Sequence, residues 1–161
     1  MNHFRIMFAA LLIAVMPLCQ AQNSVAPTSS NFESTGEDRK AIEALLDTYT
    51  RAVSTKNQAL FETILLNTNI PFSDVHSAIK GKGAAGSTSH YDSFRRGVFD
   101  GPPFMQKFQN VRIAQDGPLA DVSVVFVNTT ADETSWGWKT LQLLKVDGQW
   151  KIASEFYTGH D

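Results

Sequence analysis

Residues 136–152 read Trp136-Gly-Trp138-Lys-Thr-Leu-Gln-Leu-Leu-Lys145-Val-Asp147-Gly148-Gln-Trp150-Lys-Ile152. Two alternating runs flank the pair Asp147-Gly148, which predicts a tight hairpin because both turn residues must adopt positive φ. Similar runs occur upstream, at Met105–Gln115 and Ala120–Thr130. Together with Trp136–Val146 and Gln149–Tyr157, they predict a meander of four antiparallel strands.

Three helices are predicted before the meander. Apolar residues recur at helical spacing across Glu37–Ser54, with Thr35 as a plausible N-cap. Asn57 can cap a second helix that runs to about Leu66, and a short third helix is predicted at Ser89–Phe99. Helices followed by strands are typical of the α+β class. We expect one curved antiparallel sheet with about three N-terminal helices packed on its concave face.

The segment Ile70–Ile79 is predicted as a strand, with an irregular start at Pro71. Asp74 and His76 would then point to the same face, because side chains two residues apart on a strand do so. A carboxylate beside an imidazole can orient it and raise its pKa, which makes a competent general base near neutral pH. The alternatives are a solvated strand face and a structural hydrogen-bonded pair.

This order of elements resembles the nuclear-transport-factor-2-like (NTF2-like) superfamily, whose cone-shaped fold is shared with ketosteroid isomerases and SnoaL-like polyketide cyclases. The tail from Thr140 to Ile152 is similar to the penultimate hairpin of that group, where a short Gly turn precedes Trp-x-Ile. The second helix, beginning Lys56-Asn-Gln-Ala-Leu-Phe61, is also similar. The resemblance covers roughly Glu37 to Tyr157. It implies a sheet curled around a cavity and frequent dimers packed sheet to sheet, but no single chemistry.

Aromatic residues are the predicted ligand-binding groups. Trp136 and Trp138 share a strand face, and aromatic walls bind flat apolar ligands by burying large areas; core packing or a dimer interface would explain them equally well. Tyr91 could donate a hydrogen bond to a developing enolate oxygen, and Tyr49 could also contact a ligand. Either tyrosine could instead be a core residue with a polar end. We expect Glu155 on the sheet face opposite Trp150.

Two further motifs are set aside. Gly81-Lys-Gly83-Ala-Ala-Gly86 matches the dinucleotide fingerprint, but the physics of that motif needs a parallel βαβ unit. A flexible loop or a lid is the simpler interpretation. The spacing of His76, His90 and His160 fits no tight metal-ligand pattern. We therefore expect neither a metal nor a cofactor.

The first 21 residues are predicted to be a signal peptide. Arg5 precedes an apolar run, Pro17 breaks it, and small residues suit cleavage after Ala21. A retained N-terminal anchor is the alternative. Residues 22–35 would form a flexible leader and residues 36–158 the domain. Cleavage would remove Cys19, the single cysteine, so the mature protein would contain no disulfide. A bacterial periplasmic or secreted location is expected.

The composition also limits the partners. The formal charge is −2, so the mature chain would be mildly acidic, with no reason to bind nucleic acid or, after cleavage, a membrane. We expect a homodimeric exported protein that binds a small apolar or aromatic molecule in its cavity. The alternatives are a cofactor-free isomerase, cyclase or dehydratase that uses His76, Asp74 and Tyr91, and a dimeric protein-interaction module.

Overall fold

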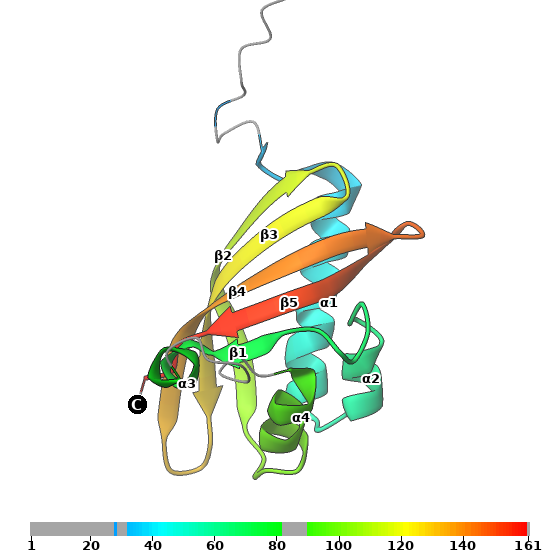
Figure 1. Ribbon diagram of the computed structural model, residues 1–161. Coiled ribbons are helices and arrows are strands. Elements are labelled where there is room, and N and C mark those ends of the chain that lie inside the picture. The colour runs from blue at the N-terminus through cyan, green and yellow to red at the C-terminus, as the bar shows by residue number, and fades with distance from the viewer. Residues whose placement is uncertain (1–27, 29–31, 82–89, 161) are drawn as a thin grey trace, which may run out of the picture.

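A computed structural model describes Thr28, residues 32–81 and residues 90–160 (Figure 1). Its elements are, in chain order, α1 (Gly36–Ser54), α2 (Gln58–Glu62), β1 (Phe72–Asp74), α3 (Val75–Lys80), α4 (Tyr91–Phe99), β2 (Met105–Asp116), β3 (Leu119–Thr129), β4 (Thr134–Val146) and β5 (Gln149–Tyr157). The predicted signal peptide and nearly all of the Gly-rich loop lie outside the described residues.

The strands form one curved sheet in the order β1-β5-β4-β3-β2. Strands β2 to β5 are the predicted antiparallel meander, and β1 adds to its edge parallel to β5, so the sheet is mixed. The hairpin between β4 and β5 turns at Asp147 and Gly148, whose φ angles are 50° and 78°. The predicted turn and the α+β class are therefore confirmed.

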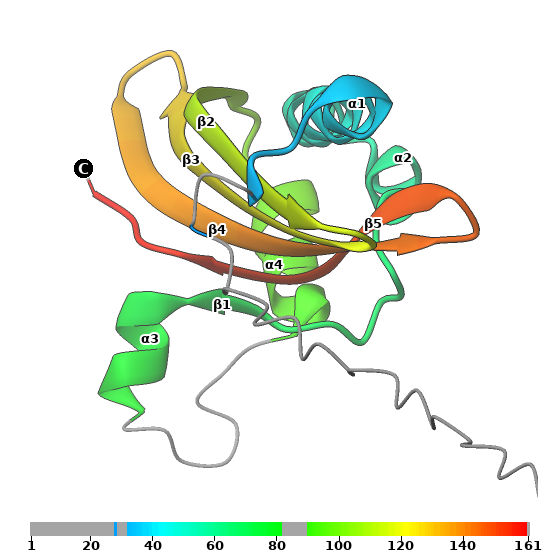
Figure 2. The same ribbon diagram turned by 90° about the horizontal axis from the view of Figure 1, so that it is seen from above.

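The helices α1, α2 and α4 lie on one side of the sheet, within its curve (Figure 2). The apolar stripe predicted for α1 is buried against the inner face of the strands, and the core includes Ile42, Leu45, Leu46, Val53, Val122, Leu141, Leu143 and Ile152. Asn57 caps α2 as predicted, because its side chain accepts a hydrogen bond from the Leu60 N–H at 2.9 Å. No helix in the described part of the chain is both long and apolar enough to cross a membrane.

The prediction of a strand over Ile70–Ile79 is correct only for Phe72–Asp74 and is wrong beyond it. The strand β1 ends at Asp74, and α3 begins at the next residue. The Asp74 carboxylate accepts hydrogen bonds from the backbone N–H of His76 at 3.2 Å and of Ser77 at 3.0 Å. Asp74 is thus an N-cap, and this local competition for backbone donors favours a helix where alternation suggested a strand.

The predicted face of Glu155 is also wrong, because β5 contains a bulge. Its pairing with β4 shifts between Ser154, opposite Gln142, and Ile152, opposite Leu143. Ala153 is the extra residue, and an extra residue reverses the alternation of side chains beyond it. Glu155 therefore lies on the same buried face as Trp150 and Ile152.

The chain before α1 already contacts the sheet. Glu33 forms a bridge with Ala114, and the Ser34 N–H donates to the Ile113 carbonyl at 3.2 Å. The first turn of α1 follows Thr35, whose side chain makes no capping hydrogen bond. The chain therefore pairs with the sheet at residues 33 and 34, before α1 begins.

Candidate functional site

A pocket of about 360 Å³ lies between α4, the beginning of β2 and the paired ends of β3 and β4. Its apolar walls come from Phe94 and Val98 on α4, Phe104 before β2, and Phe126 on β3. Its polar lining includes Gln106, Asn128 and Lys139. The volume falls within the range of about 300–1,000 Å³ found for small-molecule sites, toward its lower end.

Lys139 is buried and paired with an acid at the inner side of this pocket. Its Nζ lies 2.7 Å from Glu155 Oε1, and the two side chains are 3% and 0% exposed. Tyr49 completes the group, accepting a hydrogen bond from Lys139 Nζ and donating one to Glu155 Oε1 at 3.1 Å. Burial lowers the pKa of Lys139 and raises the pKa of Glu155, while the ion pair opposes both shifts.

Five aromatic rings surround the Lys139 ammonium. The distances from Nζ to the ring centroids are 4.5 Å for Tyr49, 5.2 Å for Phe126, 5.5 Å for Phe94, 5.5 Å for Tyr157 and 5.8 Å for Phe108. Such contacts attract a cation through the negative face of the ring. Three of these rings, on Phe94, Phe126 and Tyr157, also line the pocket, so the walls and the buried ion pair are parts of one packed unit.

Gln106 lines the pocket, and its side chain includes a fully buried acceptor. The residue is 7% exposed, and its Nε2 donates to Asn128 Oδ1 at 2.8 Å. Its Oε1 is buried and has no hydrogen-bond partner among the described residues. Glu155 Oε2 is the other such side-chain atom within the described ranges. Buried carbonyl oxygens without a partner are uncommon, because they lose the hydrogen bonds that water would give them.

Trp136 and Trp138 are both exposed, by 47% and 54%, which excludes the core alternative for them. Trp136 lines the pocket, and its ring stacks on His160 with 4.5 Å between ring centroids. His160 pairs with β4 through its backbone, donating from its N–H to the Trp136 carbonyl at 2.8 Å. Trp138 and Arg112 line a separate pocket. The two tryptophans thus do not line one pocket.

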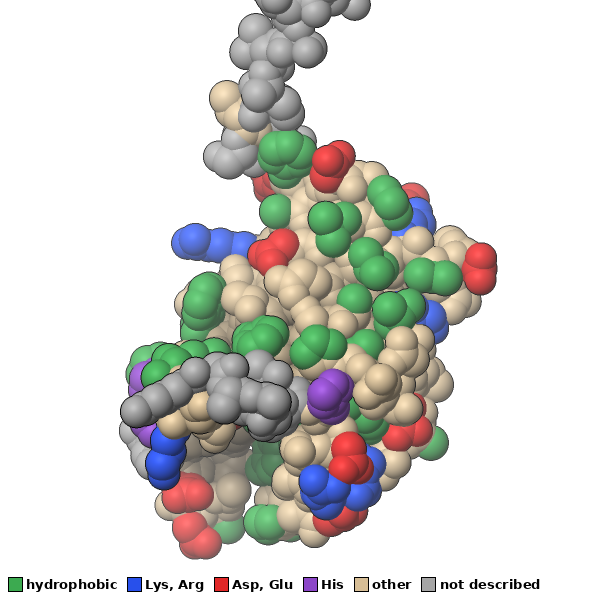
Figure 3. Space-filling model, in the orientation of Figure 1, with side chains coloured by type: hydrophobic (Ala, Val, Ile, Leu, Met, Phe, Trp, Pro, Cys, Tyr) green, Lys and Arg blue, Asp and Glu red, His purple; other side chains and the backbone are tan. Residues whose placement is uncertain are grey.

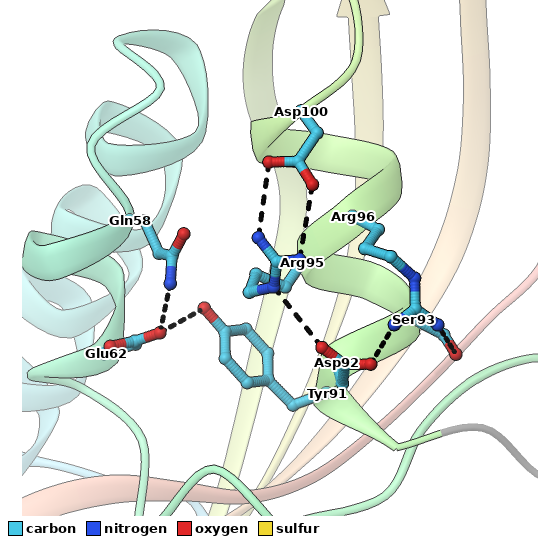
Figure 4. A network of polar contacts seen from close by, with 8 residues as sticks. All are labelled: Gln58, Glu62, Tyr91, Asp92, Ser93, Arg95, Arg96 and Asp100. Atoms are coloured by element: carbon cyan, nitrogen blue, oxygen red, sulfur yellow. Dashed lines mark hydrogen bonds and ion pairs between the residues drawn. The ribbon is translucent and has the colours of Figure 1, made fainter.

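Tyr91 and Tyr49 lie in the core rather than on the pocket lining. The Tyr91 hydroxyl donates to Glu62 Oε1 at 3.2 Å, and Gln58 Nε2 donates to the same oxygen at 2.7 Å (Figure 4). Burial, and then the charge of Glu62, raise the pKa of Tyr91. That Tyr91 or Tyr49 contacts a ligand stays a prediction.

Figure 4 also shows Arg95, on the same helix as Tyr91, which forms ion pairs with both Asp92 and Asp100.

Asp74 and His76 do not share a strand face, so the geometry on which their pairing was predicted is wrong. Asp74 holds the start of α3, and burial of its carboxylate is outweighed by the hydrogen bonds from Ser77, which keep its pKa below the usual value. A lowered pKa makes a carboxylate a weaker base. His76 is exposed, and neither residue lines the pocket. Their catalytic role stays a prediction.

Lys139, Glu155 and Gln106 were not among the predicted site residues. The sequence did contain an indication for Lys139. On β4 it lies on the same face as Leu141 and Leu143, and on the opposite face from Trp138. A charged residue in phase with a buried apolar row predicts a buried ion pair. Within the described residues, no group of three or more His, Cys, Asp and Glu side chains is arranged to hold a metal ion.

Solved structures give the clearest comparison. An NTF2-like protein of unknown function from Pseudomonas putida superimposes with a TM-score of 0.62 over 78% of this chain and 88% of its own, at 14% identity. The chain has the NTF2-like fold. The hub domain of CaMKII from S. rosetta gives a TM-score of 0.61 at 19% identity, over 79% of this chain and all of that one.

A candidate scytalone dehydratase from Novosphingobium aromaticivorans gives a TM-score of 0.59 at 16% identity, over 77% of this chain and 85% of its own. No protein-family model and no curated protein matches the sequence. The superpositions establish the NTF2-like fold. At identities this low they say nothing about activity, which has to be argued from the pocket.

Proposed function

We propose that this chain is an exported protein that binds a small, largely apolar or aromatic molecule in the pocket beside α4. The observation that carries the proposal is the combination of a volume of about 360 Å³ with walls from Phe94, Phe104 and Phe126 and a polar side at Gln106. Ligand sites commonly combine apolar walls with a few fixed polar groups. Trp136 would close one rim of the pocket against the ligand.

The ion pair of Lys139 and Glu155 would serve this function by fixing the walls. Its ammonium holds the rings of Phe94, Phe126 and Tyr157 around one point, so the pocket keeps its shape without a ligand. Preformed walls reduce the conformational entropy lost on binding.

Gly97 provides a direct test of the proposal. It lines the pocket, and a Cβ added there would meet no atom within 4 Å. Gly97→Trp should fill the pocket, whereas Gly97→Ala raises helix propensity in the same way and leaves most of the volume. The purified mature proteins are incubated with host extract, and retained small molecules are identified by mass. The wild-type protein and Gly97→Ala should retain a compound that Gly97→Trp does not; equal retention by all three would refute the proposal.

A cofactor-free enzyme is the second candidate function, favoured by the buried group of Lys139, Glu155 and Tyr49 next to the pocket. Lowering the pKa of a lysine by burial is a common route to proton transfer near neutral pH. One structural neighbour is a candidate scytalone dehydratase, although the likeness reaches only the fold. With the retained compound as substrate, Lys139→Met that is still folded by circular dichroism should have no turnover, and His76→Ala should keep it. The reverse result would restore the Asp74 and His76 hypothesis.

Export and dimerisation complete the proposal. Cleavage after Ala21 would give a mature N-terminus at Gln22, which the mass of the protein purified from its host measures directly. A mass that retains residues 1–21 would favour the anchor instead. The sheet face opposite the helices would carry a second copy of the chain. Figure 3 shows hydrophobic side chains distributed over this face.

A further inference from the structure

We propose that Lys56 sets the width of the pocket by holding the end of α4 and the ring of Phe104 in fixed places, so that the pocket selects flat ligands over thick ones. This inference rests on the proposed function and adds a residue that determines its specificity. Lys56 is not among the residues that line the pocket, whereas Val98 and Phe104 are. It acts through these two and is therefore a positioning residue.

The backbone of Lys56 occupies a position where glycine is the usual residue. Its φ is 54°, in the left-handed region that a Cβ disfavours. The Lys56 N–H donates to the Val53 carbonyl at 3.2 Å. The next N–H, of Asn57, donates to the Ala52 carbonyl at 2.8 Å. These two bonds make the Schellman ending of α1, in which glycine is preferred at the left-handed position. A lysine there has a local cost, which its side chain must offset.

The side chain of Lys56 joins two walls of the pocket. Its Nζ donates a hydrogen bond to the Val98 carbonyl. This carbonyl lies in the last turn of α4, where the helix itself supplies no donor. The same Nζ lies 4.5 Å from the centroid of the Phe104 ring, and the face of such a ring attracts a cation. One ammonium therefore links the end of a helix to the segment before β2.

No acid accompanies this ammonium in the described part of the chain. Lys56 takes part in none of the ion pairs found there. Burial lowers its pKa, and no neighbouring carboxylate opposes the shift. A lysine that only complemented the dipole of α1 could do so with its ammonium in water. The partly desolvated position of Lys56 is instead explained by its contacts with Val98 and Phe104.

The end of α4 has a second attachment, which does not include Phe104. Phe99 packs edge-on against Phe61 with 5.4 Å between the ring centroids. Loss of the Lys56 ammonium should therefore leave the helix docked and free the spacing between Val98 and Phe104. Walls that can separate accept thicker ligands, and they also bind flat ligands less tightly because the walls must be ordered again on binding.

The test compares two probes that each have ten carbon atoms and one hydroxyl group. 2-Naphthol is flat, whereas 1-adamantanol is a globular cage. Calorimetry, with competition for the weaker probe, gives the ratio of their dissociation constants for the mature wild-type protein and its variants. Lys56→Met keeps the length of the stem and removes the charge, so the preference for 2-naphthol should fall at least about fivefold. Partial unfolding would weaken both probes together and leave this ratio unchanged.

Lys56→Arg is the conservative control. Its guanidinium can donate to the Val98 carbonyl and lie over the Phe104 ring, so the preference should stay within about twofold of the wild-type value. An unchanged preference in Lys56→Met, or an equal fall in Lys56→Arg, would overturn the inference while the proposed function stands. Binding of neither probe by the wild-type protein would overturn both.

Lys56→Gly decides the question if Lys56→Met does not fold. Glycine suits a φ of 54°, so this variant is expected to fold while it lacks the ammonium. Its preference for 2-naphthol should fall at least about fivefold, as in Lys56→Met. A folded Lys56→Gly that keeps the wild-type preference would overturn the inference.

Discussion

The Nζ atom of Lys139 lies 2.7 Å from Oε1 of Glu155, and both side chains are buried. The acid comes from β5 and the base from β4, and the pair exists because the bulge at Ala153 turns Glu155 inward. The attraction within a buried ion pair offsets the large cost of removing both charges from water. Removing one partner leaves the other charge buried and unpaired, so the loss of stability in a single variant is the clearest test of the pair.

Lys139→Met should therefore destabilise the protein strongly, by about 3–5 kcal/mol, because Glu155 is left buried without a counter-charge. Urea denaturation followed by circular dichroism measures this loss. The double variant Lys139→Met, Glu155→Leu removes both charges and should recover a large part of the lost stability. A single variant that unfolds at the wild-type urea concentration would show that the pair is not formed in solution.

Gly137→Ala should damage both the fold and the pocket. A Cβ at Gly137 would lie 1.9 Å from the Thr158 carbonyl oxygen and 2.6 Å from Phe126 Cζ, so the tail or the ring must move. We expect a loss of about 1–3 kcal/mol, typical of overpacking, together with weaker binding of aromatic probes. Gly159→Ala is the matched control, because its Cβ would meet no atom within 4 Å. Equal stability of the two variants would contradict this packing.

Stability should fall at low pH through Asp38. The carboxylate accepts hydrogen bonds from Lys145 Nζ at 2.6 Å and Gln115 Nε2 at 2.8 Å, and that from Lys145 contributes most to holding its pKa below the usual 3.8. A pKa lowered by folding adds stability that is present above pH 3.8 and disappears as the pH falls through the lowered value.

The melting temperature of Asp38→Asn should thus lie below that of the wild-type protein at neutral pH, and the gap should close below pH 3.8. Thermal melts of both proteins from neutral pH to about pH 2.5 measure the gap. A gap that stays constant over this range would show that the charge of Asp38 does not stabilise the fold.

A dimer through the outer sheet face should depend on Trp138. Its ring is 54% exposed, and its β3 partner in the register is Val125. Trp138→Glu should convert the dimer to a monomer in light scattering, because a charge there would be buried without a partner. Ile79→Glu is the control: Ile79 is 70% exposed on α3, away from that face, and should leave the mass unchanged. A wild-type protein of strictly monomeric mass would contradict the pairing.

The meander and the hairpin at Asp147-Gly148 were predictable because their signals are local. Alternation and a turn that needs positive φ are written in consecutive residues. The same holds for α1, whose apolar stripe predicted its span to within one residue at its start. These elements were enough to identify the fold.

The site was less predictable, because it depends on the places where the regular alternation of side chains along a strand is interrupted. The bulge at Ala153 reverses the face of Glu155, and no composition rule marks an extra residue of this kind. The N-cap at Asp74 ended a strand that alternation continued to Ile79, which separated Asp74 from His76. Gln106 carries no signal in the sequence, because its unpaired oxygen appears only when Asn128 is placed beside it.

The most direct measurement for the pocket is a calorimetric titration of the mature wild-type protein, Gly97→Ala and Gly97→Trp with 2-naphthol. The account predicts saturable binding at one site per chain for the wild-type protein and for Gly97→Ala, and no measurable binding for Gly97→Trp. Folded Gly97→Trp that binds 2-naphthol as tightly as the wild-type protein would place the ligand elsewhere and contradict the account.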